Sequence, residues 1–129
     1  ALETARELRG TVAGAVDAAA AGVVHPDECL LNVGVHWGSA LYMGQIVSGG
    51  RLEVTALGDE VNEAARVQQA ARGGCILASK SLLEQLSDRD AAALGLDTHA
   101  IGYRTVAELP DAPEKAVRDA GGVPVASLT

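Results

Sequence analysis

The stretch RLEVTALGDEVNEAAR, residues 51–66, joins a predicted strand to a predicted helix. Alternating apolar side chains end at Gly58, and Asp59 stands where the N-terminal cap of a helix is expected. Asn62 and Arg66 follow four residues apart, so a helix places them side by side near its N-terminal end. An amide and a guanidinium beside a helix N-terminus suit the binding of a sugar and a phosphate.

Outward from this stretch, apolar periodicity and turn residues predict a mixture of helices and strands. Apolar residues at three- and four-residue intervals over 2–20 predict an amphipathic helix, and Ser48-Gly49-Gly50 predicts a tight reversal between two strands. We expect helices over 2–20, 59–72 and 80–86, a short helix or turn over 87–96, a turn of helix over 114–119, a loop over 22–28, and strands over 29–37, 39–47, 51–58, 75–79, 103–109 and 123–128. Local antiparallel pairing mixed with helices indicates an α+β fold, with the helices packed over one face of the sheet.

The composition is that of a single acidic domain, residues 1–129, with few aromatic side chains. One Trp, two Tyr, no Phe and fifteen Gly require a core of aliphatic side chains and close backbone contacts. The net charge is −7, and the Lys and Arg residues are dispersed along the chain. We therefore expect no nucleic-acid partner, since duplex binding needs a concentrated basic face, whereas a nucleotide needs only a few local cations.

Cysteine usage and hydropathy indicate a cytoplasmic protein. Cys29 and Cys75 lie far apart and form no metal-binding cluster, so we interpret them as reduced thiols rather than as a disulfide. No apolar run is long enough to span a bilayer, and no signal peptide is visible. The sequence begins at Ala1 within the first turn of a helical pattern, and we expect it to be a piece of a longer protein.

Four ordered motifs resemble the catalytic domain of class III adenylate and guanylate cyclases. They are GVHWG at 34–38, the return strand of the hairpin from Arg51 to Thr55, GDEVNEAAR at 58–66, and GCILAS at 74–79. The resemblance covers residues 1–86 well and the rest less well. It implies a partial, ferredoxin-like cyclase fold with an antiparallel-rich sheet and helices packed over it. The fold is expected to be incomplete at the N-terminus, where the family carries two metal-binding aspartates.

The resemblance implies an adenylate cyclase, a phosphorus–oxygen lyase of intracellular signalling, that works as a homodimer with ATP at the interface. In this family two Mg²⁺ or Mn²⁺ ions, held by the two upstream aspartates, activate the ribose 3′-hydroxyl for in-line attack on the α-phosphorus. The products are 3′,5′-cyclic AMP and pyrophosphate. Asn62 matches the residue that positions the ribose, and Arg66 matches the residue that stabilises charge on the α-phosphate. Without the aspartates, this chain alone is expected to be inactive.

Two substrate-binding residues are also implied by the resemblance. Thr55, seven residues before Asn62, matches a position that helps to select the base, and Thr there favours adenine. Lys115 is the best match to the family's triphosphate-binding Lys, with Arg104 as a rival. Lys115 is followed by Ala116, where the family usually has Gly.

Other interpretations of the same residues stay open. The chain could be a catalytically inactive cyclase-homology module that dimerises or binds a nucleotide in a regulatory role, or an unrelated α+β domain that binds a small ligand. Asn62 and Arg66 could be solvated helix residues, and Thr55 an ordinary strand residue. His36 is interpreted as a packed strand residue, because no second metal-type residue lies at a useful spacing, and no metal ligand is predicted in this chain.

Overall fold

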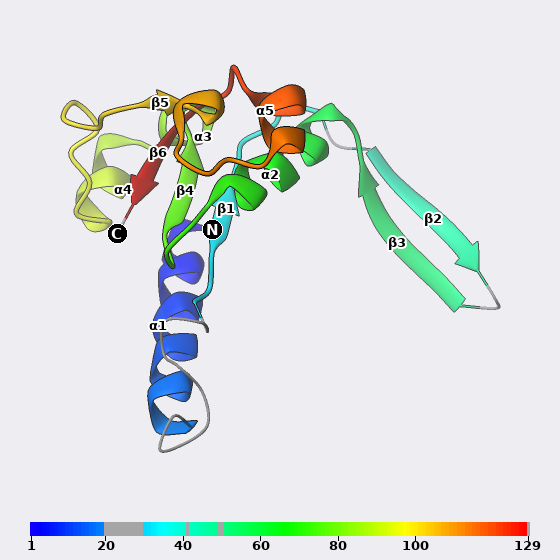
Figure 1. The fold of residues 1–129 in the computed structure, drawn as a ribbon, viewed down its shortest axis with the longest axis horizontal. Helices are drawn as coiled ribbons and strands as arrows, with labels where there is room; N and C mark the ends of the chain where they lie inside the picture. The colour runs from blue at the N-terminus through cyan, green and yellow to red at the C-terminus, as the bar shows by residue number, and fades with distance from the viewer. Residues whose placement is uncertain (20–29, 41, 49–50, 129) are drawn as a thin grey trace.

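The structure, a computed structural model, describes residues 1–19, 30–40, 42–48 and 51–128. A four-stranded sheet has the order β1 (Val33–Val35), β4 (Ile76–Ser79), β6 (Pro124–Leu128) and β5 (Arg104–Thr105), and β2 (Tyr42–Ser48) pairs with β3 (Arg51–Leu57) in a separate hairpin (Figure 1). The helices are α1 (Leu2–Ala19), α2 (Asp59–Ala70), α3 (Lys80–Leu83), α4 (Asp88–Ala93) and α5 (Glu114–Ala120), with a short 3-10 helix η2 (Val106–Glu108). The predicted α+β class is confirmed.

The four-stranded sheet is mixed, with one parallel pair and two antiparallel pairs among the described strands. β1 lies parallel to β4, and β6 lies antiparallel to both β4 and β5. The connection from β1 to β4 runs through the hairpin and α2, which is the crossover that a parallel pair requires.

Helices cover both faces of this sheet, so the prediction of helices over one face is wrong. On one face, Ile76 and Ala78 of β4 belong to a core cluster with residues of α1 and α3. On the other face, Leu77 packs in a second cluster with Val67 of α2 and Ala116 of α5. The reason lies in β4, whose residues are all buried, as expected of a strand covered on both sides.

The predicted β2–β3 hairpin is confirmed. Its antiparallel register brings Ser48 opposite Arg51, and the two residues of the reversal between them lie outside the described part of the chain. In Figure 1 the hairpin extends away from the four-stranded sheet. The Tyr42 and Met43 side chains at its base are exposed.

The strand predicted over 103–109 is much shorter in the structure and ends at Thr105. Only Arg104–Thr105 pair with β6, and the chain then turns into η2. Glu108 Oε2 accepts hydrogen bonds from the Thr105 backbone N–H at 2.7 Å and from its hydroxyl at 2.9 Å. This reciprocal capping box starts a helical turn and ends the strand.

Other predicted elements are confirmed with shifted ends. Ser79 caps α3 as predicted by accepting from the Leu82 N–H, although α3 ends at Leu83. The predicted helical turn over 114–119 is α5. Within the strand predicted over 29–37, only Val33–Val35 are paired, while Cys29 and the loop over 22–28 lie outside the described residues.

Candidate functional site

Gly58 sets the start of α2, the helix on which two clusters of polar side chains are built. Its φ of 135° lies in a region that favours glycine, and it precedes the helix without a side-chain capping hydrogen bond. The prediction that Asp59 caps the helix is therefore wrong. Asp59 is the first helical residue, where its carboxylate is favoured by the helix dipole.

Asn62 and Arg66 line one hollow, as their spacing predicted. The hollow has a volume of about 460 Å³, and its lining residues come from α2 and α5: Asp59, Asn62, Glu63, Arg66 and Asp119. Asn62 is exposed, whereas only 12% of the Arg66 side chain is exposed. The structure thus presents an amide and a guanidinium together on one face of α2.

Hydrogen bonds to neighbouring side chains orient the Arg66 guanidinium. Its Nε donates to Asp119 Oδ2 at 3.0 Å, and its Nη1 donates to Gln69 Oε1 at 2.9 Å. Asp119 Oδ1 also accepts from Arg118 Nε at 2.8 Å. The hydrogen bond from Arg118, and to a lesser extent that from Arg66, holds the pKa of Asp119 below its ordinary value. The hollow therefore carries a positive group whose charge is already balanced.

The other predicted substrate-binding residues do not line this hollow. Thr55 lies in β3, paired with Gly44 across the hairpin, and its side chain is outside what the structure describes. Lys115 is exposed on α5, one turn before Asp119, and its rival Arg104 is exposed on β5. The structure thus brings together Asn62 and Arg66, and the roles of Thr55 and Lys115 stay predictions.

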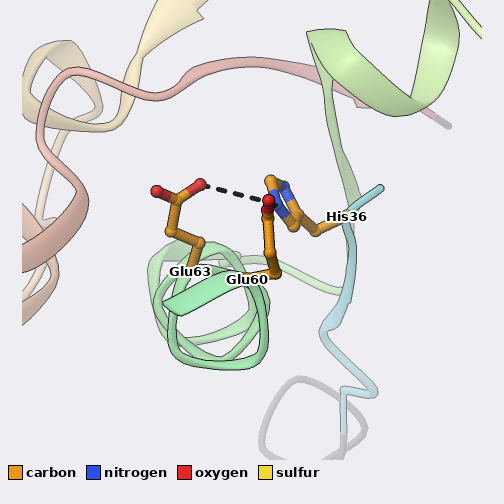
Figure 2. Close-up of side chains that lie close together, drawn as sticks. All are labelled: His36, Glu60 and Glu63. Atoms are coloured by element: carbon orange, nitrogen blue, oxygen red, sulfur yellow. Dashed lines mark hydrogen bonds and ion pairs between the residues drawn. The ribbon is translucent and has the colours of Figure 1, made fainter. Parts of the chain in front are cut away.

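A second cluster lies between α2 and the segment that follows β1. His36 Nε2 is 3.1 Å from Glu60 Oε2 and 3.4 Å from Glu63 Oε2. Figure 2 shows both glutamate side chains extending from α2 toward the imidazole ring of His36. One ligand atom from each residue lies within 4.8 Å of the others. The sequence shows no metal-type residue at a useful spacing from His36, and only the fold brings Glu60 and Glu63 beside it.

Two glycines allow this contact. A Cβ on Gly34 would lie 2.3 Å from the backbone nitrogen of Gln68, and a Cβ on Gly38 would lie 2.4 Å from the Cβ of Glu60. Both positions are too close for any larger residue unless the backbone moves. The GVHWG motif therefore lays β1 and the following residues directly on α2, with His36 between the two contacts.

Glu60 is held from two directions. Its Oε2 faces His36, and its Oε1 lies 3.4 Å from the Ser39 backbone nitrogen and 3.5 Å from the Ser39 hydroxyl. The hydrogen bond with His36, followed by that from the Ser39 backbone, lowers the pKa of Glu60 below its ordinary value. The carboxylate is therefore kept ionised beside a second carboxylate, that of Glu63.

Packing alone does not explain why a histidine is buried at position 36. Its side chain is only 5% exposed, and the buried Nδ1 has no hydrogen-bond partner among the described residues. A buried nitrogen without a partner costs stability whichever ring nitrogen carries the proton. A leucine or valine could fill this buried position without leaving a polar atom unpaired.

Sequence reasoning missed this cluster for a physical reason. The three-residue spacing of Glu60 and Glu63 places both on one helix face, which is a signal visible in the sequence. The contact between His36 and Glu60 spans 24 residues and depends on how the crossover folds back onto β1. Local periodicity carries no information about that approach.

No protein-family model, curated protein or solved structure matches this chain. In the part of the chain that the structure describes, no helix combines the length and the apolar character needed to cross a membrane. The function is therefore inferred from the residues of these two clusters and from the motifs that contain them.

Proposed function

We propose that this chain is part of a class III adenylate cyclase, which forms 3′,5′-cyclic AMP and pyrophosphate from ATP at the interface of a homodimer. One observation supports this most directly: Asn62 and Arg66 line the same hollow between α2 and α5. The order of the GVHWG and GDEVNEAAR motifs along the chain supports it as well.

Each side chain has a distinct role in this proposal. The Asn62 amide, exposed on α2, hydrogen-bonds the ribose of an ATP molecule held mostly by the partner subunit. The Arg66 guanidinium stabilises the charge that grows on the α-phosphate during in-line attack. Thr55 contacts adenine and Lys115 contacts the triphosphate.

The charge of the hollow fits a nucleotide only when cations accompany it. Asp59, Glu63 and Asp119 supply three carboxylates against the single guanidinium of Arg66. The proposed Mg²⁺ or Mn²⁺ ions would be held by aspartates expected upstream of Ala1, and they would neutralise the triphosphate. The described residues of this chain would then orient the ribose and the α-phosphate.

Activity of the complete polypeptide that contains these residues tests the proposal. We expect cyclic AMP formation from ATP with Mn²⁺ or Mg²⁺, and a decrease in kcat of about 10²–10³-fold for Asn62→Ala and for Arg66→Ala. Arg89→Ala on α4 and Gln85→Ala, both at exposed positions, are matched controls that should retain activity. A polypeptide that makes no cyclic nucleotide would refute the proposal.

The variant Asp119→Ala tests whether Arg66 acts in catalysis or only stabilises the fold. This change removes the ion pair between α2 and α5 but leaves the guanidinium in place. A catalytic Arg66 predicts that Arg66→Ala abolishes activity, whereas Asp119→Ala retains most of it even if both variants unfold at a lower temperature. Equal loss of activity in the two variants would show that Arg66 acts only by holding the helices together.

The second candidate function is a catalytically inactive module that dimerises or binds a nucleotide. The ion pair of Arg66 with Asp119 specifically favours it, because the guanidinium is already neutralised without a phosphate. Titration with a fluorescent ATP analogue, together with sedimentation to measure dimerisation, distinguishes the two functions. Binding or dimerisation without turnover in the complete polypeptide would support the inactive module.

A further inference from the structure

We propose that His36, Glu60 and Glu63 bind one Zn²⁺ ion that clamps the segment after β1 to the first turns of α2. This site is distinct from the Mg²⁺ or Mn²⁺ ions of the proposed cyclase reaction, whose ligands are expected outside this chain. It does not depend on that reaction, because binding of the ion is measured directly.

The distances match the coordination sphere of zinc. Zinc bonds of about 2.0–2.1 Å in a tetrahedral arrangement place neighbouring ligand atoms about 3.4 Å apart. The His36 Nε2 atom lies 3.1 Å from Glu60 Oε2 and 3.4 Å from Glu63 Oε2. Both distances from the imidazole fit this spacing, and the carboxylate oxygens of Glu60 and Glu63 lie within 4.8 Å of each other. The two carboxylates would close around the ion, and a water molecule would complete the tetrahedron.

The donor set selects the kind of cation. An imidazole nitrogen suits Zn²⁺, which also accepts carboxylate oxygens as ligands, whereas Mg²⁺ and Ca²⁺ prefer sites made of oxygen atoms only. Without a cation, a single Nε2–H faces two carboxylates and can be donated well to only one of them. A divalent ion would instead contact both carboxylates and the Nε2 atom together.

The surroundings orient the ligands and leave a path for the ion. Ser39 lies within hydrogen-bonding distance of Glu60 Oε1, which leaves Oε2 directed at the cluster. The buried His36 ring is held between the two close backbone contacts at Gly34 and Gly38. The cluster borders an open cavity of about 440 Å³, which Trp37 also lines.

Glu63 connects this site to the hollow of Asn62 and Arg66, because it lines both cavities. A bound ion would cancel part of the negative charge beside Arg66. Zinc would thus both cross-link β1 to α2 and make the neighbouring hollow less repulsive to a phosphate.

Competition with a chromophoric zinc indicator tests the site on the purified chain after treatment with a chelator. We expect one equivalent of Zn²⁺ per chain. Loss of a ligand in His36→Gln, Glu60→Gln or Glu63→Gln should weaken binding by more than the roughly 10–100-fold that loss of an outer-shell partner costs. His99→Gln and Glu84→Gln change the same residue types at exposed positions and should bind as the unaltered chain does. Equal concentrations of Mg²⁺ or Ca²⁺ should not displace Zn²⁺.

Co²⁺ provides a second measurement that locates the ion. Trp37, the single tryptophan of the chain, is adjacent to His36, so bound Co²⁺ should quench its fluorescence and saturate at one equivalent. Glu63→Gln should abolish this quenching, and it is the variant most compatible with folding because the Glu63 side chain is 40% exposed. Cys75→Ser should leave both measurements unchanged.

The possible outcomes are distinct. Absence of stoichiometric zinc binding would overturn the proposal, as would binding that persists in the three ligand variants and is lost in Cys75→Ser or His99→Gln. Normal zinc binding in a polypeptide without cyclase activity would remove the proposed function and leave this site intact.

Discussion

The two sides of α2 differ in how they are packed and in how their charges are balanced. On the side of α5, Arg66 meets Asp119 in an ion pair of 3.0 Å. On the side of β1, Glu60 and Glu63 meet around His36, so that like charges lie together. Opposite charges in contact can be explained by stability alone. Two carboxylates beside the His36 Nε2 atom repel each other, and the proposed Zn²⁺ ion would offset that repulsion.

The two sides of α2 also differ in the kind of atoms that pack against the helix. The α5 side is closed by small apolar side chains, with Val67 and Ala116 fully buried. On the β1 side the two backbones are in direct contact, with Gly34 packed against the backbone of Gln68. A contact between backbones has no flexible side chain that can yield, so substitutions on the two sides should have unequal effects.

Gly34→Ala should have the largest effect, because it wedges β1 away from α2. The added Cβ would lie 2.3 Å from the backbone nitrogen of Gln68, and overpacking of this kind costs about 3 kcal/mol of the free energy of unfolding. Urea denaturation followed by circular dichroism measures it. Gly102→Ala is the matched control, since a Cβ there meets nothing within 4 Å.

The same variant sharpens the comparison between the two sides. Separation of β1 from α2 should weaken zinc binding at His36, while the Arg66–Asp119 contact on the opposite side is unaffected. If Gly34→Ala unfolds at the same urea concentration as Gly102→Ala, the close contact of β1 with α2 is not present in solution.

Val67→Ala tests the α5 side and should have a smaller effect. Val67 is completely buried between α2, the sheet and α5, and loss of its two methyl groups leaves a cavity that costs about 2 kcal/mol. Val117→Ala is a matched control on α5, where Val117 is 38% exposed, and should change the free energy of unfolding by less than about 0.5 kcal/mol. Equal effects of the two changes would mean that α5 is not docked on α2.

The sequence predicts the features of α2 that depend on local spacing. The placement of Asn62 beside Arg66 follows from a four-residue interval, and the existence of the helix follows from its apolar periodicity. The helix begins at residue 59 as predicted, but its N-cap is Gly58, whose positive φ supplies the entry that Asp59 was expected to cap.

Features that depend on distant contacts were not predicted. The burial of β4 on both faces could have been suspected from its continuous apolar run, but the identity of the covering helices could not. The meeting of His36 with Glu60 requires the crossover to return α2 onto β1. Thr105 and Glu108 have the spacing of a capping box, and this local signal overrides the strand-like alternation over 103–109.

Asp119→Asn should give the smallest effect, and one that depends on pH. Hydrogen bonds from Arg118 and Arg66 lower the pKa of Asp119 in the folded chain below its ordinary value of 3.8. A carboxylate with a lowered pKa stabilises the fold above its ordinary pKa and loses that contribution as the pH falls through the folded value. The melting temperature of the unaltered chain should therefore exceed that of Asp119→Asn by a constant amount between about pH 5 and 7. This difference should disappear as the pH falls below about 3.8.

The pH dependence also shows whether Arg66 is free for another role. In an Arg66→Ala background, Asp119→Asn should give a smaller gap, because part of the interaction is already lost. The gap should also shrink in high salt, since the Asp119 side chain is 32% exposed and its ion pairs are screened. An unchanged gap in the Arg66→Ala background would mean that Arg118 alone holds Asp119, and the Arg66 guanidinium would then be available to a phosphate without breaking any contact that stabilises the fold.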